Sequence, residues 1–241
     1  MNILVQDVRS VMVLTGAGVS AESGVPTFRG EGGLWRHHRA EELATPRAFY
    51  RDPTLVWEWY DWRRGLINDC QPNPAHRTLA EMEAQFDDFV LVTQNVDGLH
   101  SLAGSQNLVE LHGNIWRMRC TRMCRPSWED RSAPLHAIPP RCPSCGEMTR
   151  PDVVWFGEAL PREAIEEADA TARRCQIMLV IGTSAVVQPA ASLPVLALQS
   201  GAHLVEFNPR PTPLSAHVDV TVREPAAESV PRWWSDWLAE S

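Results

Sequence analysis

The histidine at position 112 stands where an imidazole could transfer protons. His112 follows a short expected strand, residues 109–111, and precedes Gly113, whose missing side chain lets another backbone come close. Because imidazole titrates near neutrality, His112 could act as a general base at physiological pH. Histidines serve equally often as structural hydrogen-bonding groups, and these residues alone favour neither role. We assign the structural role to six other histidines: His37, His38, His76, His136, His203 and His217.

A glycine-rich turn near the start of the chain could bind a phosphate. Residues 11–14 form an apolar run too short for a helix, which predicts a buried strand. This strand leads into Gly16, Ala17 and Gly18, where backbone N–H groups could approach a phosphate with no side chain between them. The dinucleotide fingerprint G-x-G-x-x-G requires a third glycine earlier than Gly24. The glycine pair is therefore equally consistent with a tight turn between a strand and a helix.

Four cysteines in two close pairs predict a metal site. Cys120 and Cys124 form C-x-x-x-C, Cys142 and Cys145 form C-x-x-C, and seventeen residues separate the pairs. Such pairs suit a tetrahedral Zn²⁺ held by four thiolates, a closed structural site that leaves no position for catalysis. Disulfides are the weaker explanation in a chain that we expect to be cytoplasmic. The alternative is a module that binds metal poorly or uses His136 as a ligand.

Two helices that begin with a capping residue and a proline follow the glycine turn. Asp52 and Asn73 each precede a proline, which predicts helices over about 53–68 and 74–85 within a helical region, 31–86. The first helix carries apolar side chains at helical spacing, and these predict its packing face: Leu55, Trp59, Trp62 and Leu66. Tyr60 and Arg63 lie three residues apart on a different face.

Strands and helices alternate through the rest of the chain. We expect strands at 89–92, 108–111, 177–181, 203–207 and 218–222, and helices at about 161–174, 189–199 and 226–238. This alternation predicts a parallel α/β sheet of the Rossmann type, in which ligands bind beyond the carboxyl ends of the strands. Several residues directly follow expected strands and could therefore meet in one crevice: Gly16, Gln94, His112, Gly182 and Asn208.

The composition is that of an ordinary globular protein. With 241 residues, 44% of them hydrophobic and 22% charged, the chain fits one domain or one domain with a smaller lobe. A formal charge of −8 disfavours direct binding of nucleic acid. No apolar run is long enough to span a membrane, and the first residues lack the basic region of a signal peptide. We expect a cytoplasmic protein.

Five motifs, in order along nearly the whole chain, resemble those of the sirtuins, the NAD-dependent protein-lysine deacylases. The motifs are GAGVSAESGVPTFRG at 16–30, QNVD at 94–97, LHG at 111–113, VWFGE at 154–158 and GTS at 182–184. The resemblance implies a single catalytic domain, 1–241, with a Rossmann-like lobe of about 1–31, 87–115 and 152–241. A small lobe would combine a helical module, about 32–86, with a zinc module, about 116–151. The C-x-x-x-C pair departs from the C-x-x-C of the family.

The resemblance also implies that NAD is consumed as a co-substrate. Asn95 would orient the reacting ribose and His112 would be the general base. The other implied NAD-binding residues are Gly16, Ala17, Gly18, Ser20, Glu22, Pro26, Thr27, Phe28, Arg29, Trp35, Gln94, Val96, Asp97, Gly182, Thr183, Ser184, Asn208, Pro209, Arg210 and Ala226. In this mechanism an acyl-lysine oxygen displaces nicotinamide, and the products are free lysine and an O-acyl-ADP-ribose.

The implied substrates are acylated lysines of proteins. Residues 153–156 would form a strand that pairs with an extended substrate peptide, within an implied substrate segment of Val154, Trp155, Phe156, Gly157 and Glu158. Tyr60 and Arg63 resemble the branch of sirtuins that removes succinyl, malonyl and glutaryl groups, since arginine matches a carboxylate. Ala44 would leave room for the longer acyl chain. We expect desuccinylation and demalonylation above deacetylation, which is retained.

Two other functions use the same residues. The same cleavage of NAD could transfer ADP-ribose to a protein side chain, or the chain could be a non-catalytic NAD-binding module. The presence of His112, Asn95 and Asp97 disfavours a pure binding module, which needs no base. The sequence leaves the protein substrates and the oligomeric state open.

Overall fold

A computed structural model of the chain describes residues 4–26, 34–35 and 38–240. Its helices are η1 (Val5–Asp7), η2 (Ala17–Ser23), α1 (Ala40–Leu43), α2 (Pro46–Arg51), α3 (Pro53–Asn68), α4 (Pro74–Glu83), α5 (Leu99–Ala103), α6 (Arg162–Arg174), η4 (Ala190–Ser192), α7 (Leu193–Gln199) and α8 (Ala226–Ala239). Its strands are β1 (Ser10–Thr15), β2 (Leu34–Trp35), β3 (His38–Arg39), β4 (Asp88–Thr93), β5 (Leu108–Glu110), β6 (Gly113–Cys120), β7 (Trp128–Glu129), β8 (Thr149–Val153), β9 (Ile177–Ile181), β10 (His203–Phe207) and β11 (Val220–Val222).

A six-stranded parallel sheet forms the larger lobe, as the alternation of strands and helices predicted. The strand order is β11-β10-β9-β1-β4-β5. β1 lies in the middle and pairs in parallel with both β4 and β9. The chain builds outwards from β1 to β4 and β5, then returns to β9 on the other side, so the strand order reverses beside β1. Ligands of such sheets bind at this reversal, beyond the carboxyl ends of the strands.

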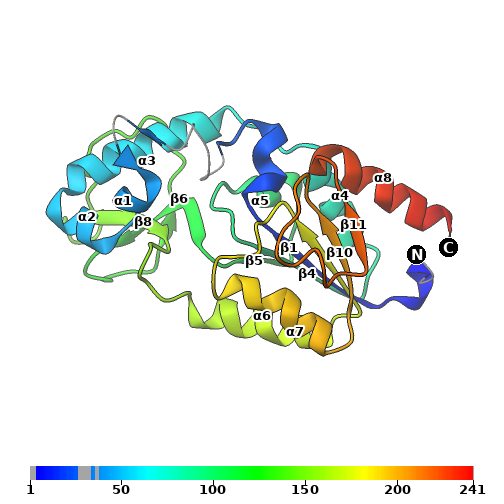
Figure 1. Cartoon of the computed structure of the whole chain (residues 1–241). Helices are drawn as coiled ribbons and strands as arrows, with labels where there is room; N and C mark the ends of the chain where they lie inside the picture. Colours follow the sequence, from blue (N-terminus) through cyan, green and yellow to red (C-terminus); the bar gives the residue numbers. More distant parts are fainter. Residues whose placement is uncertain (1–3, 27–33, 36–37, 241) are drawn as a thin grey trace.

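Helices cover both faces of this sheet. Figure 1 shows α4 and α8 on one face and α6 and α7 on the other. The side chains of β1 alternate accordingly: Val11 and Val13 pack into the core beneath α4 and α8, and Met12 and Leu14 pack into the core beneath α6 and α7. A strand covered on both faces needs apolar residues at every position, which explains the continuous apolar run in the sequence.

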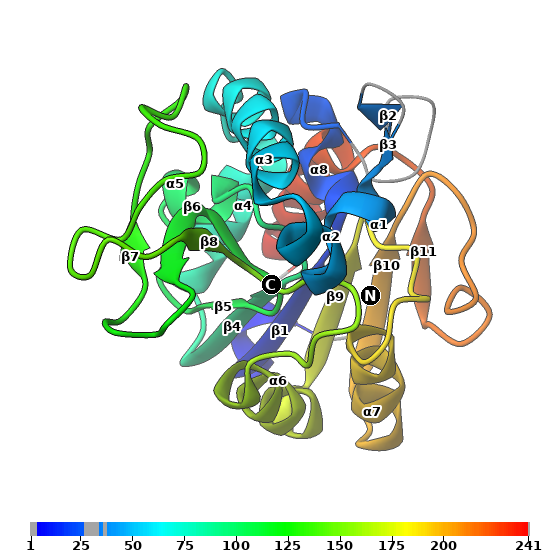
Figure 2. The same ribbon diagram turned by 90° about the vertical axis from the view of Figure 1, so that its left-hand side faces the viewer.

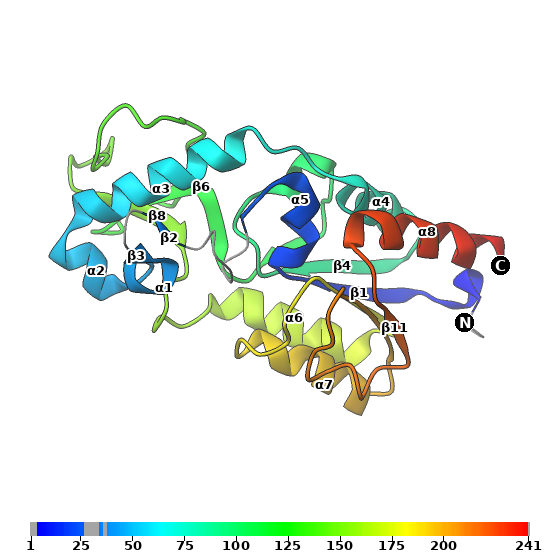
Figure 3. The same cartoon turned by 45° about the horizontal axis from the view of Figure 1, so that its top comes forward.

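The smaller lobe combines a helical part with a three-stranded antiparallel sheet. Figure 2 shows α1, α2 and α3 beside this sheet, whose order is β7-β6-β8. Figure 3 shows α3 running along the lobe towards the larger sheet. A core rich in tryptophan joins α3 to β6 and β8. β6 starts three residues after β5 ends, so residues 111 and 112 connect the two sheets.

Three capping side chains start α2, α3 and α4. Of these, α4 packs on the larger sheet (Figure 1), so the helical module expected at 32–86 does not lie wholly in the smaller lobe. Thr45, Asp52 and Asn73 accept hydrogen bonds from backbone N–H groups of α2, α3 and α4, respectively, and a proline follows each of them. These groups would otherwise lack an acceptor at the helix start. The predicted starts of α3 and α4 are therefore confirmed.

The predicted packing face of α3 is correct only in part. Trp59 is buried and Leu55 packs against the same core, but Trp62 and Leu66 are exposed. The other buried residues of the helix include Val56, Tyr60, Ile67 and the charged Arg64. Arg64 can be buried because its Nε donates to the Ile115 carbonyl at 2.9 Å and its Nη1 to Asp130 Oδ1 at 3.0 Å. These hydrogen bonds allow a charged residue to be buried in α3, a position that apolar spacing alone does not predict.

Other predictions differ in their bounds. The expected helix at 189–199 is a short 3₁₀ turn followed by α7, and the expected strand at 218–222 is shortened to β11. The expected strand at 153–156 is also wrong, because β8 ends at Val153. The region 31–86 contains the β2–β3 hairpin besides its helices. None of the described helices is long and apolar enough to cross a membrane.

Candidate active site

The glycine turn predicted to bind a phosphate, at 16–18, meets the loop of Gly182 at the reversal beside β1. Gly16 N donates to the Ile181 carbonyl at 3.0 Å, and Gly18 N donates to the Gly182 carbonyl at 2.8 Å. A Cβ atom on Gly18 would lie 2.7 Å from Gly182 Cα, and Gly182 has a φ of +61°. Neither position can carry a side chain without displacing the other loop. Glycine at these positions therefore lets the two loops pack against each other, and the N–H groups of Gly16, Gly18 and Gly182 are used by carbonyls of neighbouring segments.

Polar side chains link the ends of neighbouring strands beside these loops. Gln94, after β4, donates from Nε2 to Thr183 Oγ1 at 3.1 Å and to the Thr15 carbonyl at 3.3 Å. Asn208, after β10, donates from Nδ2 to the Thr183 carbonyl at 2.8 Å. The residues predicted to converge from separate strands therefore do converge.

The remaining predicted cofactor residues differ in their surroundings. Ala17, Pro26, Val96 and Ser184 are half-buried, and Pro209 and Arg210 are exposed. Ala226 is the buried first residue of α8, whose Ala227 N donates to Glu22 Oε2 at 3.2 Å, so the end of η2 contacts this helix. Trp35 belongs to β2. Thr27, Phe28 and Arg29 lie outside the described residues.

A buried polar network lies beneath the glycine loops. Ser20 Oγ donates to Asp97 Oδ2 at 2.8 Å and accepts from Asn95 Nδ2 at 3.1 Å. His76 Nε2 lies 3.3 Å from the same hydroxyl, and Asn73 N donates to His76 Nδ1. Because Nδ1 accepts, the neutral imidazole carries its proton on Nε2 and donates it to Ser20. The side chains of Asp97, Asn95 and His76 thus all bond to the Ser20 hydroxyl. These bonds fix the positions of Asn95 and Asp97, the residues predicted to bind the nicotinamide end of NAD.

Burial sets the charge of this network. Desolvation lowers the pKa of His76 to about 4, with a smaller contribution from the charge of Arg77. Desolvation also lowers the pKa of His100, whose Nε2 lies 3.1 Å from Thr15 Oγ1. The pKa of Asp97 is raised by burial, which outweighs hydrogen bonds from Leu99 N and Ser20 and the charge of Arg63. Both histidines are neutral at physiological pH.

Sequence reasoning gave His76 only a general structural role and assigned none to His100. For His76 a signal existed: it stands three residues after Asn73 and accepts from that residue's N–H in a capping box. His100 lies in a five-residue helix between two left-handed glycines, a segment without hydrophobic periodicity.

His112 lies at the junction of the two sheets. Its Nδ1 is 2.8 Å from the Gln94 carbonyl, and its own carbonyl accepts from Val154 N at 2.9 Å. A carbonyl can only accept, so Nδ1 carries the proton of the neutral ring and Nε2 keeps its lone pair. Burial lowers the pKa of His112, and the bond to Gln94 only partly offsets this shift. The side chain is therefore neutral near pH 7, as a proton acceptor must be.

The close approach expected at Gly113 is made by the chain itself. Gly113 has a φ of +77°, and a Cβ atom there would lie 2.1 Å from the Asp152 carbonyl oxygen. Gly113 pairs with Val153 across β6 and β8. Glycine at this position therefore joins two strands rather than admitting a substrate backbone.

Two of the residues predicted to recognise an acyl group, Ala44 and Tyr60, lie in the smaller lobe together with Trp155 of the segment that follows β8. Ala44, Tyr60 and Trp155 are all buried in the core of the smaller lobe. Phe156 N donates to the Ala44 carbonyl at 2.9 Å, and Trp155 Nε1 donates to Tyr60 Oη at 2.9 Å. Three segments separated in sequence are thus brought together.

Tyr60 and Arg63 influence each other's pKa. Burial raises the pKa of the Tyr60 hydroxyl to about 12, against the hydrogen bond from Trp155 and the charges of Arg63 and Arg150. Burial lowers the pKa of Arg63, and Tyr60 and Asp97 partly offset this. The Arg63 guanidinium lies 5.3 Å from the Trp59 ring centre. The pair therefore offers a neutral phenol and a cation, the two donors that a carboxylate binds.

The segment predicted to pair with a peptide is held internally. Val154 N and Phe156 N donate to the His112 and Ala44 carbonyls, and Trp155 N donates to Glu158 Oε2 at 2.9 Å. The segment after Val153 belongs to no strand. Because these three N–H groups already donate within the protein, they are not available to pair with a peptide. Phe156 is 51% exposed and Gly157 has a φ of +86°.

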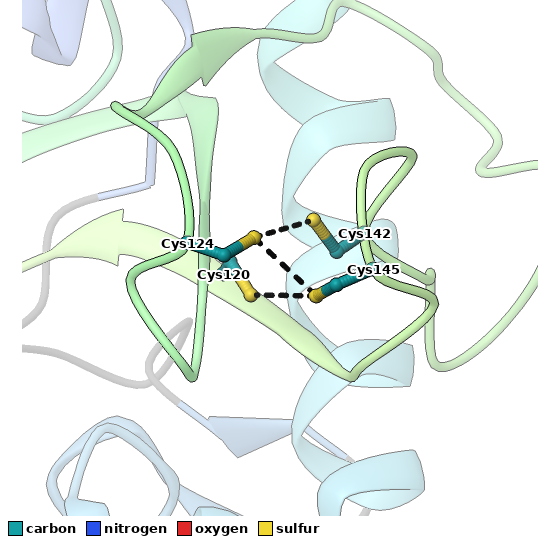
Figure 4. Close-up of side chains that lie close together, drawn as sticks. All are labelled: Cys120, Cys124, Cys142 and Cys145. Atoms are coloured by element: carbon teal, nitrogen blue, oxygen red, sulfur yellow. Dashed lines mark hydrogen bonds between the residues drawn. The ribbon is translucent and has the colours of Figure 1, made fainter.

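The four predicted zinc ligands form one cluster (Figure 4). Their Sγ atoms lie within 4.8 Å of one another, with separations of 3.6 Å for Cys120 to Cys145 and 3.5 Å for Cys124 to Cys142. A tetrahedral zinc with sulfur ligands requires sulfur separations of about 3.8 Å. The extra residue of C-x-x-x-C is absorbed by Met123, which has a φ of +50° and is exposed. The cluster fits a structural zinc.

Within this cluster the thiols differ: hydrogen bonds with Cys145 and Cys142 raise the pKa of Cys124 to about 12, whereas backbone groups favour the thiolate of Cys142. Desolvation raises the pKa of the Cys142 thiol, but N–H groups of Ser144 and Cys145 and the neighbouring thiols outweigh it and lower the pKa to about 6. A thiolate is the form that binds zinc. His136, the alternative ligand, is exposed and lies outside the cluster.

Comparisons with known proteins agree with this arrangement. The sequence profile of the Sir2 family matches residues 16–189. An "NAD-dependent protein deacylase" of Aquifex aeolicus is 50% identical over 231 residues, which are 96% of each chain. A solved complex of a Sir2 homolog with NAD has a TM-score of 0.92 at 46% identity and covers 98% of this chain and 92% of its own. A solved Sir2 with an inhibitor, 2'-O-acetyl-ADP-ribose and a deacetylated p53 peptide has a TM-score of 0.83 at 32% identity, covering 97% and 96%.

Proposed function

The chain belongs to the Sir2 family, and from this premise we propose that it is an NAD-dependent protein-lysine deacylase that favours succinyl and malonyl over acetyl groups. The observation that carries the proposal is the position of His112. Its Nδ1 is held by the Gln94 carbonyl at the carboxyl edge of the parallel sheet, one residue before the small sheet begins. Its Nε2 is left to accept a proton from a substrate bound between the two lobes.

NAD is the co-substrate in this proposal. The glycine loops at 16–18 and 182 would lie against the pyrophosphate, and Thr183 and Asn208, which are joined by a hydrogen bond, would lie at the adenosine end. The network of Ser20, Asn95 and Asp97 would fix the nicotinamide ribose and carboxamide. Related proteins support this assignment, since a solved Sir2 homolog of the same fold binds NAD.

The chemistry then follows from what the side chains can do. The acyl oxygen of the substrate lysine attacks the anomeric carbon of the ribose, and nicotinamide leaves with the bonding electrons. His112 Nε2 removes the proton from a ribose hydroxyl, which then attacks the acyl carbon. Water completes the release of lysine and an O-acyl-ADP-ribose. The four-cysteine cluster lies in the smaller lobe, and a zinc ion bound there would stabilise the fold of that lobe without taking part in the reaction.

Recognition of the acyl group is assigned to Ala44, Tyr60 and Arg63. Tyr60 is a donor at every physiological pH because its pKa is about 12. Arg63 supplies the positive charge for the distal carboxylate of a succinyl or malonyl chain. Acetyl-lysine lacks this carboxylate, so it gains nothing from either residue.

We place the enzyme in the cytoplasm, acting on acylated lysines of proteins. Four thiolates can hold zinc only in the reduced state, which favours a cytoplasmic protein. Substrates would be acylated lysines in extended protein segments lying near Val154 and Phe156, although the N–H groups of this segment are engaged internally. A solved Sir2 complex that contains a deacetylated peptide supports this substrate class.

The test compares release of nicotinamide with acetyl-, succinyl- and malonyl-lysine peptides of one sequence. The enzyme should process succinyl and malonyl peptides with a higher kcat/KM than the acetyl peptide. Arg63→Met should lower the ratio of succinyl to acetyl kcat/KM at least tenfold, an effect of about 1.4 kcal/mol, because the carboxylate loses its charged partner. Arg51→Met, on α2, serves as the matched control. A ratio that Arg63→Met leaves unchanged would remove Arg63 from acyl recognition.

A further inference from the structure

The hydroxyl of Tyr60 is held from one side by another side chain. Trp155 Nε1 donates to Tyr60 Oη at 2.9 Å, and the two side chains are 2% and 3% exposed. Tyr60 belongs to α3, whereas Trp155 follows β8, so the bond joins the helical part of the smaller lobe to the predicted substrate segment. A phenol oxygen that accepts on one side must direct its own proton elsewhere.

Contacts with neighbouring side chains fix the orientation of the Trp155 ring. The Arg150 guanidinium lies 3.4 Å from the centre of its ring, and Phe49 packs at 5.2 Å. Arg150 donates to both carboxylate oxygens of Glu158, at 2.6 Å and 2.8 Å, and Glu158 Oε2 also accepts from Trp155 N. The indole is therefore held by its ring face and by its backbone. Its N–H has a single direction, towards Tyr60.

The charge of Arg150 is balanced by Glu158, which leaves Arg63 as the cation beside Tyr60. The hydrogen bonds to Arg150 and Trp155 N and the charge of Arg150 outweigh desolvation and lower the pKa of Glu158, so it is a carboxylate paired with Arg150. Tyr60 is neutral because burial holds its pKa at about 12. Arg63 is the cation next to the phenol along α3.

We propose that Trp155 is a positioning residue for acyl selectivity: its indole N–H fixes the Tyr60 hydroxyl so that the phenol proton is directed at the distal carboxylate of the substrate. The inference rests on the proposed function, in which Tyr60 and Arg63 receive that carboxylate. Trp155 contacts the acyl chain only through Tyr60. Its effect must therefore vanish when the Tyr60 hydroxyl is removed and when the acyl chain has no carboxylate.

A double-mutant cycle on the full-length enzyme tests this requirement. Trp155→Phe keeps an aromatic ring but removes the N–H, and Tyr60→Phe removes the hydroxyl. We expect Trp155→Phe to lower the ratio of succinyl to acetyl kcat/KM about fivefold to tenfold, mainly through KM of the succinyl peptide. In the Tyr60→Phe background the same change should lower the ratio less than twofold, since no hydroxyl remains to be positioned.

Trp57→Phe is the matched control. Trp57 is a second fully buried tryptophan of the same lobe, and its Nε1 donates to the Thr149 carbonyl at 2.8 Å. Its replacement also costs a buried indole hydrogen bond. The Trp57 ring packs edge-on against the Tyr60 ring at 6.3 Å, and phenylalanine keeps an aromatic ring at this contact, so the succinyl-to-acetyl ratio should stay unchanged. Thermal unfolding of each variant separates a loss of stability from a loss of selectivity.

The failures of the two proposals are distinguishable. The positioning role is overturned if Trp155→Phe leaves the ratio unchanged, or if its effect on the ratio is undiminished in the Tyr60→Phe background. The role is also overturned if Trp57→Phe lowers the ratio equally. If Arg63→Met does not lower the ratio, the acyl assignment itself fails, whatever Trp155→Phe does.

Discussion

Acid should destabilise this protein through its buried histidines, and His76 allows the size of the effect to be worked out. Its pKa is about 4 in the folded chain, against 6.5 for an unperturbed histidine. The unfolded state therefore binds the proton first as pH falls. The contribution to the free energy of unfolding is fully present above pH 6.5 and is lost progressively as pH falls from 6.5 to about 4.

The expected magnitude follows from the part of this window that is crossed. Between about pH 7.5 and about pH 5, only the interval below 6.5 counts, roughly 1.5 pH units at about 1.4 kcal/mol each. The loss from His76 alone is therefore about 2 kcal/mol. His100 adds to it with the same sign, and Asp97 acts in the opposite direction because burial raises its pKa.

The assay is urea unfolding followed by tryptophan fluorescence at both pH values, for the wild type and for His76→Gln. Glutamine retains polar groups near Ser20 but does not titrate. His76→Gln should be less stable at about pH 7.5, yet it should lose about 2 kcal/mol less than the wild type on acidification. Other titrating groups are common to both proteins and cancel in this comparison. An equal loss in both proteins would refute the assignment of His76 as a buried neutral side chain.

Three further predictions concern the site and its support. Burial lowers the pKa of His112, so kcat/KM should fall only on the acid side with a midpoint below 6.5; a midpoint above 6.5 would contradict a buried neutral base. Gly182→Ala should lower Tm and weaken NAD binding, because the added Cβ would lie 2.4 Å from Val19 N, whereas Gly201→Ala, at a φ of +90° in open space, should cost only about 1 to 2 kcal/mol; equal costs would exclude the contact between the loops. Mercurial titration of the thiols should release one zinc per wild-type chain and none from Cys142→Ser; a metal-free wild type would refute the site.

Much of the larger lobe could be predicted because its strands are covered on both faces. The apolar run at 177–181 and the strand expected at 203–207 coincide with β9 and β10. β4 extends beyond its predicted run to Asp88 and Thr93, since these polar side chains bond Ser10 and Thr15 of the neighbouring strand. Such cross-strand bonds are not visible in a single segment. The convergence of glycine loops and polar residues followed from the rule that ligands bind where parallel strands end.

The smaller lobe was harder to predict because distant contacts determine it. Arg64 is buried only because Ile115 and Asp130, far along the chain, accept its hydrogen bonds. The three-stranded sheet of β6, β7 and β8 depends on pairing across the cysteine loops. The contact of Trp155 with Tyr60 spans ninety-five residues, and no local pattern announces it. Local signals did predict helix starts and the grouping of the four cysteines, since capping residues and cysteine spacing act within a few residues.

The central claim is that NAD is cleaved by the acyl oxygen of a substrate lysine, with His112 as the base. The most direct measurement is mass spectrometry of all products after the enzyme is mixed with NAD and a succinyl-lysine peptide. The chain contains no lysine, so every deacylated lysine detected comes from the peptide. We predict nicotinamide, free lysine peptide and O-succinyl-ADP-ribose in equal amounts. Intact NAD, or ADP-ribose attached to a protein side chain, would contradict the account.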